Sequence, residues 1–401
     1  MKAVILAAGE GRRMYPLTDT RPKVMLPVAN KPIVEHLLIS LREAGVREIL
    51  FVVGYHSEKI REYFGDGSRW SVTVQYATQK KQLGTADAVR QVSSWAGDRF
   101  ILVNGDVVLG TDDIKALMKC DNAAIGLSPQ KDVSGLGVVE MQEASVVRIH
   151  EKVQNPPSNM VNTGLYLLTR DIFDAIDDTR LSCRGQYELT DSLQLLIDRG
   201  VPLTGHAVSN WLNFTYPWDL LNANQSLMTA AQSSDIEGEV EQGAVTKGPV
   251  SVGKGSVVRS GSYITGPVAI GEGCDIGPNC YIRPCTAIGN GCHIGAFVEV
   301  KNSILMAGAR APHHNYVGDS VVGEQCNLGA GSKTANLRLD RGHIHSTGID
   351  TGRNKLGAII GDGVQVGINA SINVGCSIGS YSVIGPGTVV SGTLLPRSIV
   401  M

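Results

Sequence analysis

A cluster of basic side chains follows the first apolar segment of the chain in an order suited to phosphate chemistry. The sequence GEGRRM at residues 9–14 comes directly after the apolar residues 3–8, and Lys23 follows. Met14 stands where a dinucleotide-binding loop needs its third glycine, and the Gly-Lys-Ser/Thr ending of a P-loop is missing. We therefore expect a glycine-rich turn whose N–H groups, with Arg13 and Lys23, face phosphate oxygens, although the turn alone also fits an ordinary tight bend.

The same turn belongs to a longer succession of motifs. They read LAAGEGRRMYPLTDTRPKVMLPV at 6–28, QKKQLGTA at 79–86, NGD at 104–106, LGV at 136–138, EK at 151–152 and NTG at 162–164. This succession closely resembles the sugar-phosphate nucleotidyltransferases. The resemblance implies an enzyme that joins a nucleoside triphosphate to a sugar 1-phosphate and releases pyrophosphate.

The chemistry of that reaction explains the residue types in these motifs. A sugar phosphate oxygen attacks the α-phosphorus of a triphosphate, so two anions must be held together and screened by cations. By resemblance, Arg13 and Lys23 are catalytic, while Asp106 and Asn213 hold a bridging Mg²⁺. Many members that make nucleotide-glucose carry Asp at the position of Asn213, whereas bacterial N-acetylglucosamine-1-phosphate uridyltransferases carry Asn.

The resemblance also assigns the binding residues of this first site. A glutamine amide offers both an acceptor and a donor to a pyrimidine edge, so we expect UTP or dTTP at Gln79 rather than a purine nucleotide. The residues expected to bind the nucleotide are Leu6, Ala8, Gly9, Gly11, Gln79, Gly84 and Thr85. Those expected to bind the sugar are Gly137, Glu151, Lys152 and Asn162.

A second group of chemistry-bearing residues lies in the C-terminal half. The sequence APHHNYVGD at 311–319 resembles the acetyltransferase centre of the bifunctional bacterial uridyltransferases, with His313 at the position of the general base. There, a neutral imidazole takes a proton from the glucosamine amine as it attacks the thioester of acetyl-CoA. By resemblance, the substrate contacts are Arg283, Lys301, Tyr316, Asn327 and Asn336, and Ala330 lies beside acetyl-CoA.

At several positions, this second group of residues differs from the bacterial enzymes. The bacterial enzymes carry a sugar-binding lysine six residues beyond Asn336, where this chain has Gly342, and Lys355 is the candidate substitute. We expect no counterpart of the basic tail that contacts coenzyme A in the bacterial proteins. His314 is an alternative inward-facing histidine, and the HIH sequence at 343–345 stays unassigned because no third metal ligand is evident.

The elements that position the first site alternate between strands and helices. Strands are expected at 2–8, 49–53, 100–104 and 123–127, and helices at 33–44 and 112–119. This alternation predicts a Rossmann-like, mostly parallel sheet covered by helices, with ligands at the carboxyl ends of the strands.

The second site lies in a region with a six-residue period. Aliphatic residues recur at Val252, Val258, Ile264, Ile270, Ile276, Ile282, Ile288 and Ile294, then at Ile360, Val366, Ile372, Ile378, Ile384 and Val390, with a looser stretch at Val317, Val322 and Leu328. This period fits the flat sides of a coil that each point one aliphatic side chain inward. By resemblance to hexapeptide-repeat proteins, the coil is a left-handed parallel β-helix. Corner-filling rather than metal-binding cysteines are expected at Cys274, Cys280, Cys292, Cys326 and Cys376.

The bulk properties of the 401-residue chain limit its partners. A net charge of −2 provides no basic field for nucleic acid, and no apolar run approaches membrane-spanning length. We expect a cytoplasmic protein with neither partner. The predicted domains are a nucleotidyltransferase domain at 1–225, a linker at 226–245 and a left-handed β-helix acyltransferase-like domain at 246–401.

Taken whole, the sequence resembles the archaeal bifunctional sugar-1-phosphate nucleotidylyltransferase/acetyltransferases. The resemblance implies acetylation of glucosamine or galactosamine 1-phosphate with acetyl-CoA and formation of a UDP- or dTDP-sugar, UDP-N-acetylglucosamine foremost, by a Mg²⁺-dependent homotrimer. One alternative is a nucleotidyltransferase whose β-helix serves only trimerisation or regulation. A non-catalytic regulator that binds sugar nucleotides is less favoured, because Arg13, Lys23 and Asp106 are all present. The sequence leaves the nucleotide and sugar preferences open.

Overall fold

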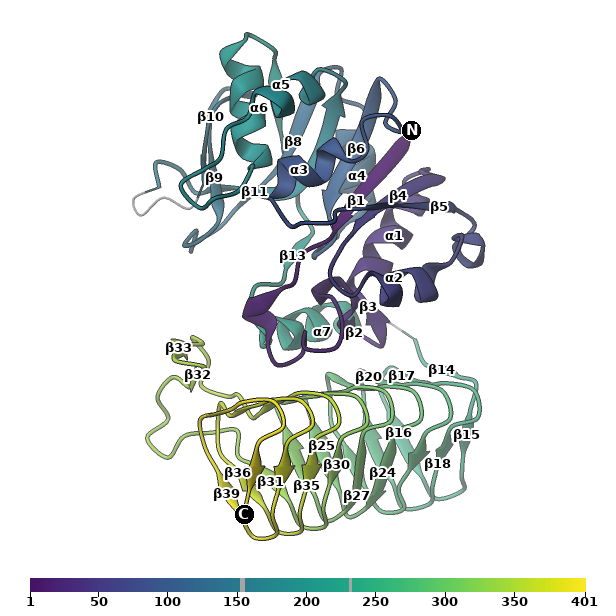
Figure 1. Ribbon diagram of the computed structural model, residues 1–401. Helices are drawn as coiled ribbons and strands as arrows, with labels where there is room; N and C mark the ends of the chain where they lie inside the picture. The colour runs from purple at the N-terminus through teal and green to yellow at the C-terminus, as the bar shows by residue number, and fades with distance from the viewer. Residues whose placement is uncertain (152–155, 231–232) are drawn as a thin grey trace. The chain divides into compact units, whose positions relative to one another are not determined.

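The computed structural model describes residues 1–151, 156–230 and 233–401, which form two compact units (Figure 1). The first unit comprises Met1–Glu10, Arg21–Met25 and Pro32–Asn213, and the second comprises Gly11–Thr20, Leu26–Lys31 and Phe214–Met401. The glycine-rich turn is thus grouped with the second unit. Within the described ranges, no helix is long and apolar enough to cross a membrane.

A nine-stranded sheet in the order β5-β4-β1-β6-β11-β8-β12-β10-β9 forms the centre of the first unit. Its strands are β1 (Lys2–Ala7), β4 (Glu48–Val53), β5 (Thr73–Thr78), β6 (Arg99–Asn104), β8 (Ala123–Pro129), β9 (Gly137–Gln142), β10 (Ser145–Glu151), β11 (Met160–Thr169) and β12 (Leu203–Ala207). Strands β5, β4, β1 and β6 are parallel, but β11 runs antiparallel to β6 and β8. The continuous parallel sheet expected from the sequence is therefore found in the half that ends at β6, and the other half is mixed, with β8 and β12 as a parallel pair.

Two hydrophobic cores flank this sheet. Ala3 and Ile5 of β1 point into one core and Val4 into the other, as alternation along a strand requires. The first core includes residues of α1, α2 and α4, and the second includes residues of α3, α5 and α6. The helices are α1 (Ile33–Glu43), α2 (Ser57–Phe64), α3 (Thr85–Arg90), α4 (Thr111–Leu117), α5 (Ile172–Asp178) and α6 (Leu189–Asp198). The strands and helices that the sequence predicted here are all present, within two residues at each end.

Two short antiparallel pairs complete the N-terminal half. Strand β7 (Val107–Leu109) pairs with β13 (Trp211–Asn213), and β2 (Pro27–Val28) pairs with β3 (Lys31–Pro32). Helix α7 (Asp219–Thr229) belongs to the second unit.

The rest of the second unit is a coil in which successive strands visit three parallel sheets in turn (Figure 1). The first sheet contains β14 (Asp235–Ile236), β17 (Val250–Val252), β20 (Val268–Ile270), β23 (Thr286–Ile288), β26 (Ile304–Leu305), β29 (Val321–Val322), β34 (Ile359–Ile360), β37 (Ser377–Ile378) and β40 (Thr393–Leu394). The second contains β15 (Glu239–Val240), β18 (Val257–Val258), β21 (Asp275–Ile276), β24 (His293–Ala296), β27 (Arg310–His313), β30 (Asn327–Leu328), β35 (Gln365–Val366), β38 (Val383–Ile384) and β41 (Ile399–Val400). The third contains β16 (Val245–Lys247), β19 (Tyr263–Thr265), β22 (Tyr281–Ile282), β25 (Glu299–Lys301), β28 (Tyr316–Gly318), β31 (Lys333–Thr334), β36 (Ser371–Ile372) and β39 (Val389–Val390).

The coil explains the six-residue period. Val252 pairs with Ile270 and Ile270 with Ile288, so one turn takes eighteen residues, or three six-residue sides. Every aliphatic residue of the two strict series is at most 3% exposed. We call residues 235–400 the coiled region; its stacked parallel sheets are consistent with a β-helix. It begins within the segment 226–245 that the sequence assigned to a linker, and α7 occupies the first residues of that segment.

The five cysteines of the repeat are buried in the same core. Burial raises the pKa of the Cys292 thiol to about 12 and that of Cys376 to about 11. Such thiols stay protonated and act as small apolar groups, which agrees with the corner-filling role expected from the sequence.

The looser part of the repeat has two geometric causes. Ile288 pairs with Leu305 and Leu305 with Val322, so these two turns are each one residue shorter. After β31, the chain then leaves the coil at Asn336 and returns at Leu356, whose N–H donates to the Asn336 carbonyl at 3.1 Å. We call residues 337–355 the excursion. It carries the hairpin of β32 (His345–Ser346) and β33 (Ile349–Asp350).

Candidate functional site

Several of the residues expected at the first site gather at the carboxyl ends of strands in the first unit. Gln79 directly follows β5, Asp106 comes just after β6, and Leu6 and Ala8 stand at the end of β1. Ligands of open α/β sheets bind at this edge. The sequence-based location of the site therefore coincides with the edge that the sheet provides.

A cavity of about 270 Å³ opens in this unit. Its walls come from segments far apart in the chain, including the ends of β6, β10 and β13. The lining residues that the sequence had singled out are Thr85, Asp106, Gly137, Glu151, Asn162 and Asn213. The fold thus brings residues of the proposed nucleotide, sugar and metal sites to one space.

Asp106 in the cavity wall lies beside a cation. The Lys23 ammonium lies 2.6 Å from Asp106 Oδ2, and Asn213 pairs across two strands with Val107, the residue after Asp106. Carboxylate and amide oxygens are ligands that Mg²⁺ accepts, and Mg²⁺ in phosphoryl sites uses few protein ligands. The donor set therefore fits the magnesium ion implied by the sequence.

On the sugar side of the cavity lies a cluster of charged residues. Arg184 contacts Glu151 Oε1 at 3.1 Å and Glu188 Oε1 at 2.8 Å, and the Thr190 hydroxyl donates to Glu151 Oε2 at 3.4 Å. A Cβ at Gly137 would come within 3.1 Å of Glu151 Oε2, so a side chain there would crowd the carboxylate. The sequence analysis missed Arg184, which lies in an irregular loop outside the family motifs.

Asn162 stands at an irregularity of β11. Its Nδ2 donates to the Tyr166 hydroxyl at 2.7 Å, and its Oδ1 accepts from the Gly164 N–H at 2.9 Å. Burial raises the pKa of Tyr166, so this hydroxyl stays protonated. These contacts fix the Asn162 side chain at the cavity wall. Lys152, also expected to bind the sugar, lies outside the described residues.

On the nucleotide side of the site, the structure changes what we expect of the Gln79 amide. Gln79 is 4% exposed, and its Nε2 donates to the Gly84 carbonyl at 3.0 Å and to Asp87 Oδ2 at 2.8 Å. The amide donor is thus engaged within the protein, and Oε1 is the group that remains for a base. Gly84 has a φ of 122°, and an added Cβ would collide with the Tyr187 backbone, so only glycine fits.

The glycine-rich turn has an irregular backbone. Gly11, with a φ of 70°, precedes the 3₁₀ turn Arg12–Met14, and Arg13 is exposed. An added Cβ at Gly9 would meet open space. Since Gly11–Thr20 is grouped with the second unit, the role of Arg13 rests on the signature sequence.

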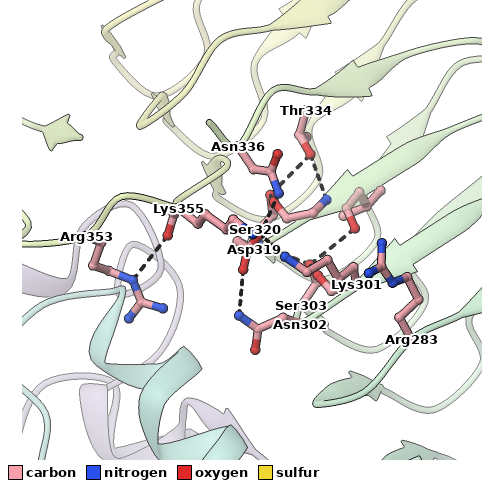
Figure 2. A network of polar contacts seen from close by, with 12 residues as sticks. Arg283, Lys301, Asn302, Ser303, Asp319, Ser320, Thr334, Asn336, Arg353 and Lys355 are labelled. Carbon is pink, nitrogen blue, oxygen red and sulfur yellow. Dashed lines mark hydrogen bonds and ion pairs between the residues drawn. The ribbon is translucent and has the colours of Figure 1, made fainter. Parts of the chain in front are cut away.

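The second candidate site follows the third sheet of the coiled region, part of which is seen in Figure 2. Arg283, Lys301 and Tyr316 come from or directly after the neighbouring strands β22, β25 and β28. A bond from Arg283 Nη1 to Glu299 Oε1 at 2.8 Å raises the pKa of the guanidinium. Asn336 follows the next strand, β31, and its Nδ2 donates to the Tyr316 hydroxyl at 3.2 Å. Four of the expected contacts therefore stand on consecutive turns.

The two neighbouring histidines both point outward. His313 ends β27 and is exposed, and the exposed His314 ring stacks on Phe297 with centroids 5.2 Å apart. Asn315 is the inward residue; it is 2% exposed and donates to the Gly329 carbonyl at 2.8 Å. The alternative that His314 faces inward is therefore wrong, because the amide fills the corner.

The remaining expected contacts lie on the second sheet and on the excursion. Asn327 begins β30 and Ala330 follows that strand, both half-buried. Gly342 lies within the excursion, whereas Lys355 stands where the chain rejoins the coil beside Asn336, in the group of side chains shown in Figure 2. Arg353 Nε donates to the Lys355 carbonyl at 3.4 Å, and burial lowers the pKa of Arg353. The return of the chain thus brings the backbone next to Lys355 back beside Asn336, and the role of Lys355 as the substitute lysine stays a prediction.

Comparison with known proteins covers both halves of the chain. The nucleotidyl transferase family matches residues 2–230, and the GMPPB C-terminal domain matches residues 264–369. The chain is 42% identical over 411 residues to the bifunctional protein GlmU of Methanococcus maripaludis strain C7, spanning 100% of this chain and 97% of that protein. It is 39% identical over 401 residues to the bifunctional sugar-1-phosphate nucleotidylyltransferase/acetyltransferase of Sulfurisphaera tokodaii, spanning 98% and 97%.

A solved structure is similar to the N-terminal half. It is a Bacillus anthracis protein assigned as a glucose-1-phosphate thymidylyltransferase, in complex with sucrose, with a TM-score of 0.53 and 30% identity. The likeness covers 59% of this chain and 98% of that one. The fold and its first site thus define a nucleotidyl transferase joined to a repeat region. More narrowly, the chain belongs to the family of bifunctional GlmU and sugar-1-phosphate nucleotidylyltransferase/acetyltransferase proteins.

Proposed function

We propose that the chain is a bifunctional enzyme of nucleotide-sugar synthesis. Its first unit forms a UDP- or dTDP-sugar, UDP-N-acetylglucosamine foremost, from the triphosphate and a sugar 1-phosphate with release of pyrophosphate. The coiled region acetylates glucosamine or galactosamine 1-phosphate with acetyl-CoA. The observation that carries the first activity is that Asp106, Glu151, Asn162 and Asn213 line one common cavity.

In nucleotidyl transfer the protein supplies position and charge. Lys23, together with Arg13, screens the phosphates of the two substrates while the sugar phosphate oxygen attacks the α-phosphorus and pyrophosphate leaves. Asp106 and Asn213 would hold Mg²⁺, which would further compensate the phosphate charge. Gln79 offers Oε1 to the N3–H of uracil or thymine, which favours UTP or dTTP. Glu151 accepts hydrogen bonds from sugar hydroxyls.

In acetyl transfer, His313 accepts the amine proton as the substrate nitrogen attacks the thioester carbonyl, and coenzyme A leaves as the thiol. Arg283 and Lys301 hold the phosphate, while Tyr316, Asn327, Asn336 and, as the substitute sugar-binding lysine, Lys355 contact the amino sugar, and Ala330 contacts the acetyl-CoA. The family resemblance supports a left-handed β-helix, assembly as a homotrimer and a cytoplasmic protein.

The two activities are tested by separate products. UTP and dTTP are each paired with glucose, N-acetylglucosamine and N-acetylgalactosamine 1-phosphates, with Mg²⁺, and pyrophosphate is measured. Coenzyme A release is measured with glucosamine and galactosamine 1-phosphates. We expect His313→Ala to abolish coenzyme A release and to leave pyrophosphate release intact. Wild-type protein that releases pyrophosphate but no coenzyme A would instead support a coil used for assembly or regulation.

A further inference from the structure

Asp319 is a buried carboxylate at the centre of a polar network in the coiled region (Figure 2). The residue is 3% exposed, and three side chains donate to it. Asn302 Nδ2 lies 2.7 Å from its Oδ1, while Lys301 Nζ and Asn336 Nδ2 lie 3.0 Å and 2.5 Å from its Oδ2. A buried carboxylate is costly unless it is compensated by such donors. The network therefore ties Lys301 and Asn336 to one point.

The backbone around Asp319 is also fixed. The Gly318 N–H donates to Thr334 Oγ1 at 3.0 Å, and the Ser320 N–H donates to Ser303 Oγ at 3.1 Å. The Asp319 carbonyl accepts from the Gly357 N–H at 2.8 Å, which joins it to the chain returning from the excursion. Neighbouring turns thus hold the carboxylate in place.

A carboxylate only accepts hydrogen bonds, so it decides how its neighbours point. Asn336 gives one amide hydrogen to Asp319 and the other to the Tyr316 hydroxyl, which leaves its Oδ1 for a donor on a ligand. The Lys301 ammonium donates one N–H to Asp319, and its other two N–H groups can donate to a ligand. The pair offers a cation and an acceptor, which complement a phosphate and an amine or hydroxyl.

A purely conformational role for Asp319 is the competing explanation. Its φ is 50°, and Asn302 on the preceding turn has a φ of 45°. Asp and Asn both tolerate this left-handed conformation, so corner geometry alone would be served equally by asparagine. Asparagine, however, can donate as well as accept, and it carries no charge. The substitution Asp319→Asn therefore separates the two roles.

We propose that Asp319 is a positioning residue for the acyl-acceptor substrate. It holds Lys301 toward the phosphate and turns the Oδ1 of Asn336 toward the amine or a hydroxyl of an amino sugar 1-phosphate. The inference rests on the proposed acetyltransferase function of the coiled region.

The test compares D319N with the wild-type full chain. We expect the KM for glucosamine 1-phosphate to rise about tenfold, and kcat to change by less than about threefold, because ordered charge-assisted hydrogen bonds are lost. Binding of glucosamine 1-phosphate, followed by calorimetry, weakens in parallel. Pyrophosphate release and the unfolding temperature report folding. Asp275→Asn, which alters another ion-paired carboxylate of the coil, is the matched control and leaves both constants unchanged.

A double-mutant cycle with Lys301→Met tests whether Asp319 acts through its neighbour. The effects of D319N and K301M on KM are expected to be less than additive, because both disrupt one arrangement. Fully additive effects, or a wild-type KM in D319N, would overturn the inference while leaving the acetyltransferase function standing. Should D319N not fold, Asn302→Gly loosens the carboxylate and keeps the corner conformation; an unchanged KM in that variant overturns the inference equally. Wild-type protein that neither binds nor acetylates glucosamine 1-phosphate overturns both the proposed function and the inference.

Discussion

The two candidate sites position their side chains in different ways. In the first unit, loops at the ends of strands close around a cavity of about 270 Å³, and each loop contributes its own side chain. In the coiled region, the candidate side chains stand on consecutive turns, and hydrogen bonds such as Asn336 to Asp319 connect one turn to another. The first site depends on where individual loops lie, whereas the second depends on register, because a slip would move a whole set of side chains.

The substitution with the largest expected effect should stop the activity of the first site and leave the activity of the second unchanged. Asp106→Asn removes the carboxylate that contacts Lys23 and, as proposed, the magnesium ion. We expect pyrophosphate release to fall about a thousandfold, as when a group that stabilises transition-state charge is lost. Coenzyme A release should be unchanged. A parallel loss of both activities would contradict the separation of the sites.

A core substitution tests whether the stacked aliphatic residues stabilise the coil that carries the second site. Ile372 is 1% exposed inside the coil, and Ser371, its neighbour in β36, is exposed. Ile372→Ala should cost about 2–5 kcal/mol of unfolding free energy, measured by denaturant titration, because it leaves a cavity in a stacked core. Ser371→Ala is the control, with a cost below about 0.5 kcal/mol. Equal effects of the two substitutions would show that the stacked aliphatics are not the source of stability.

The smallest effect concerns a single loop of the first site. Arg184→Met removes the cation between Glu151 and Glu188. We expect about a tenfold higher KM for the sugar 1-phosphate with kcat nearly unchanged, because Glu151 loses the contact that orients it. Arg180→Met alters an exposed arginine of the same unit and should have no effect. A fall in kcat alone would place Arg184 in the chemical step instead.

Regular patterns were the part of the fold that the sequence predicted well. The aliphatic residue at every sixth position has one geometric explanation, so positions such as Ile282 could be placed inside the coil without coordinates. The motifs around Asp106 and Glu151 predicted residues that the fold brings to one cavity. In both cases, a short sequence pattern occurs in only one kind of structural environment, so the pattern predicts that environment.

Long-range pairing could not be predicted in the same way. Strand β11 is apolar like its neighbours, and nothing local says that it runs antiparallel to β6. Arg184 lies in an irregular loop, and the burial of Asp319 depends on two other turns of the coil. The sequence likewise did not show that the chain next to Lys355 returns to the side of Asn336, because the six-residue repeat does not give the length or path of an excursion.

The excursion leaves the coil and rejoins it across the single main-chain bond between Asn336 and Leu356. Strands β31 and β36 still pair in register on either side of it, so the stack accommodates the interruption. The excursion also packs on the stack: Ile344 is fully buried, and a Cβ at Gly375 would collide with the His345 carbonyl. Its exposed residues can therefore change without disturbing the stack, whereas Ile344 cannot.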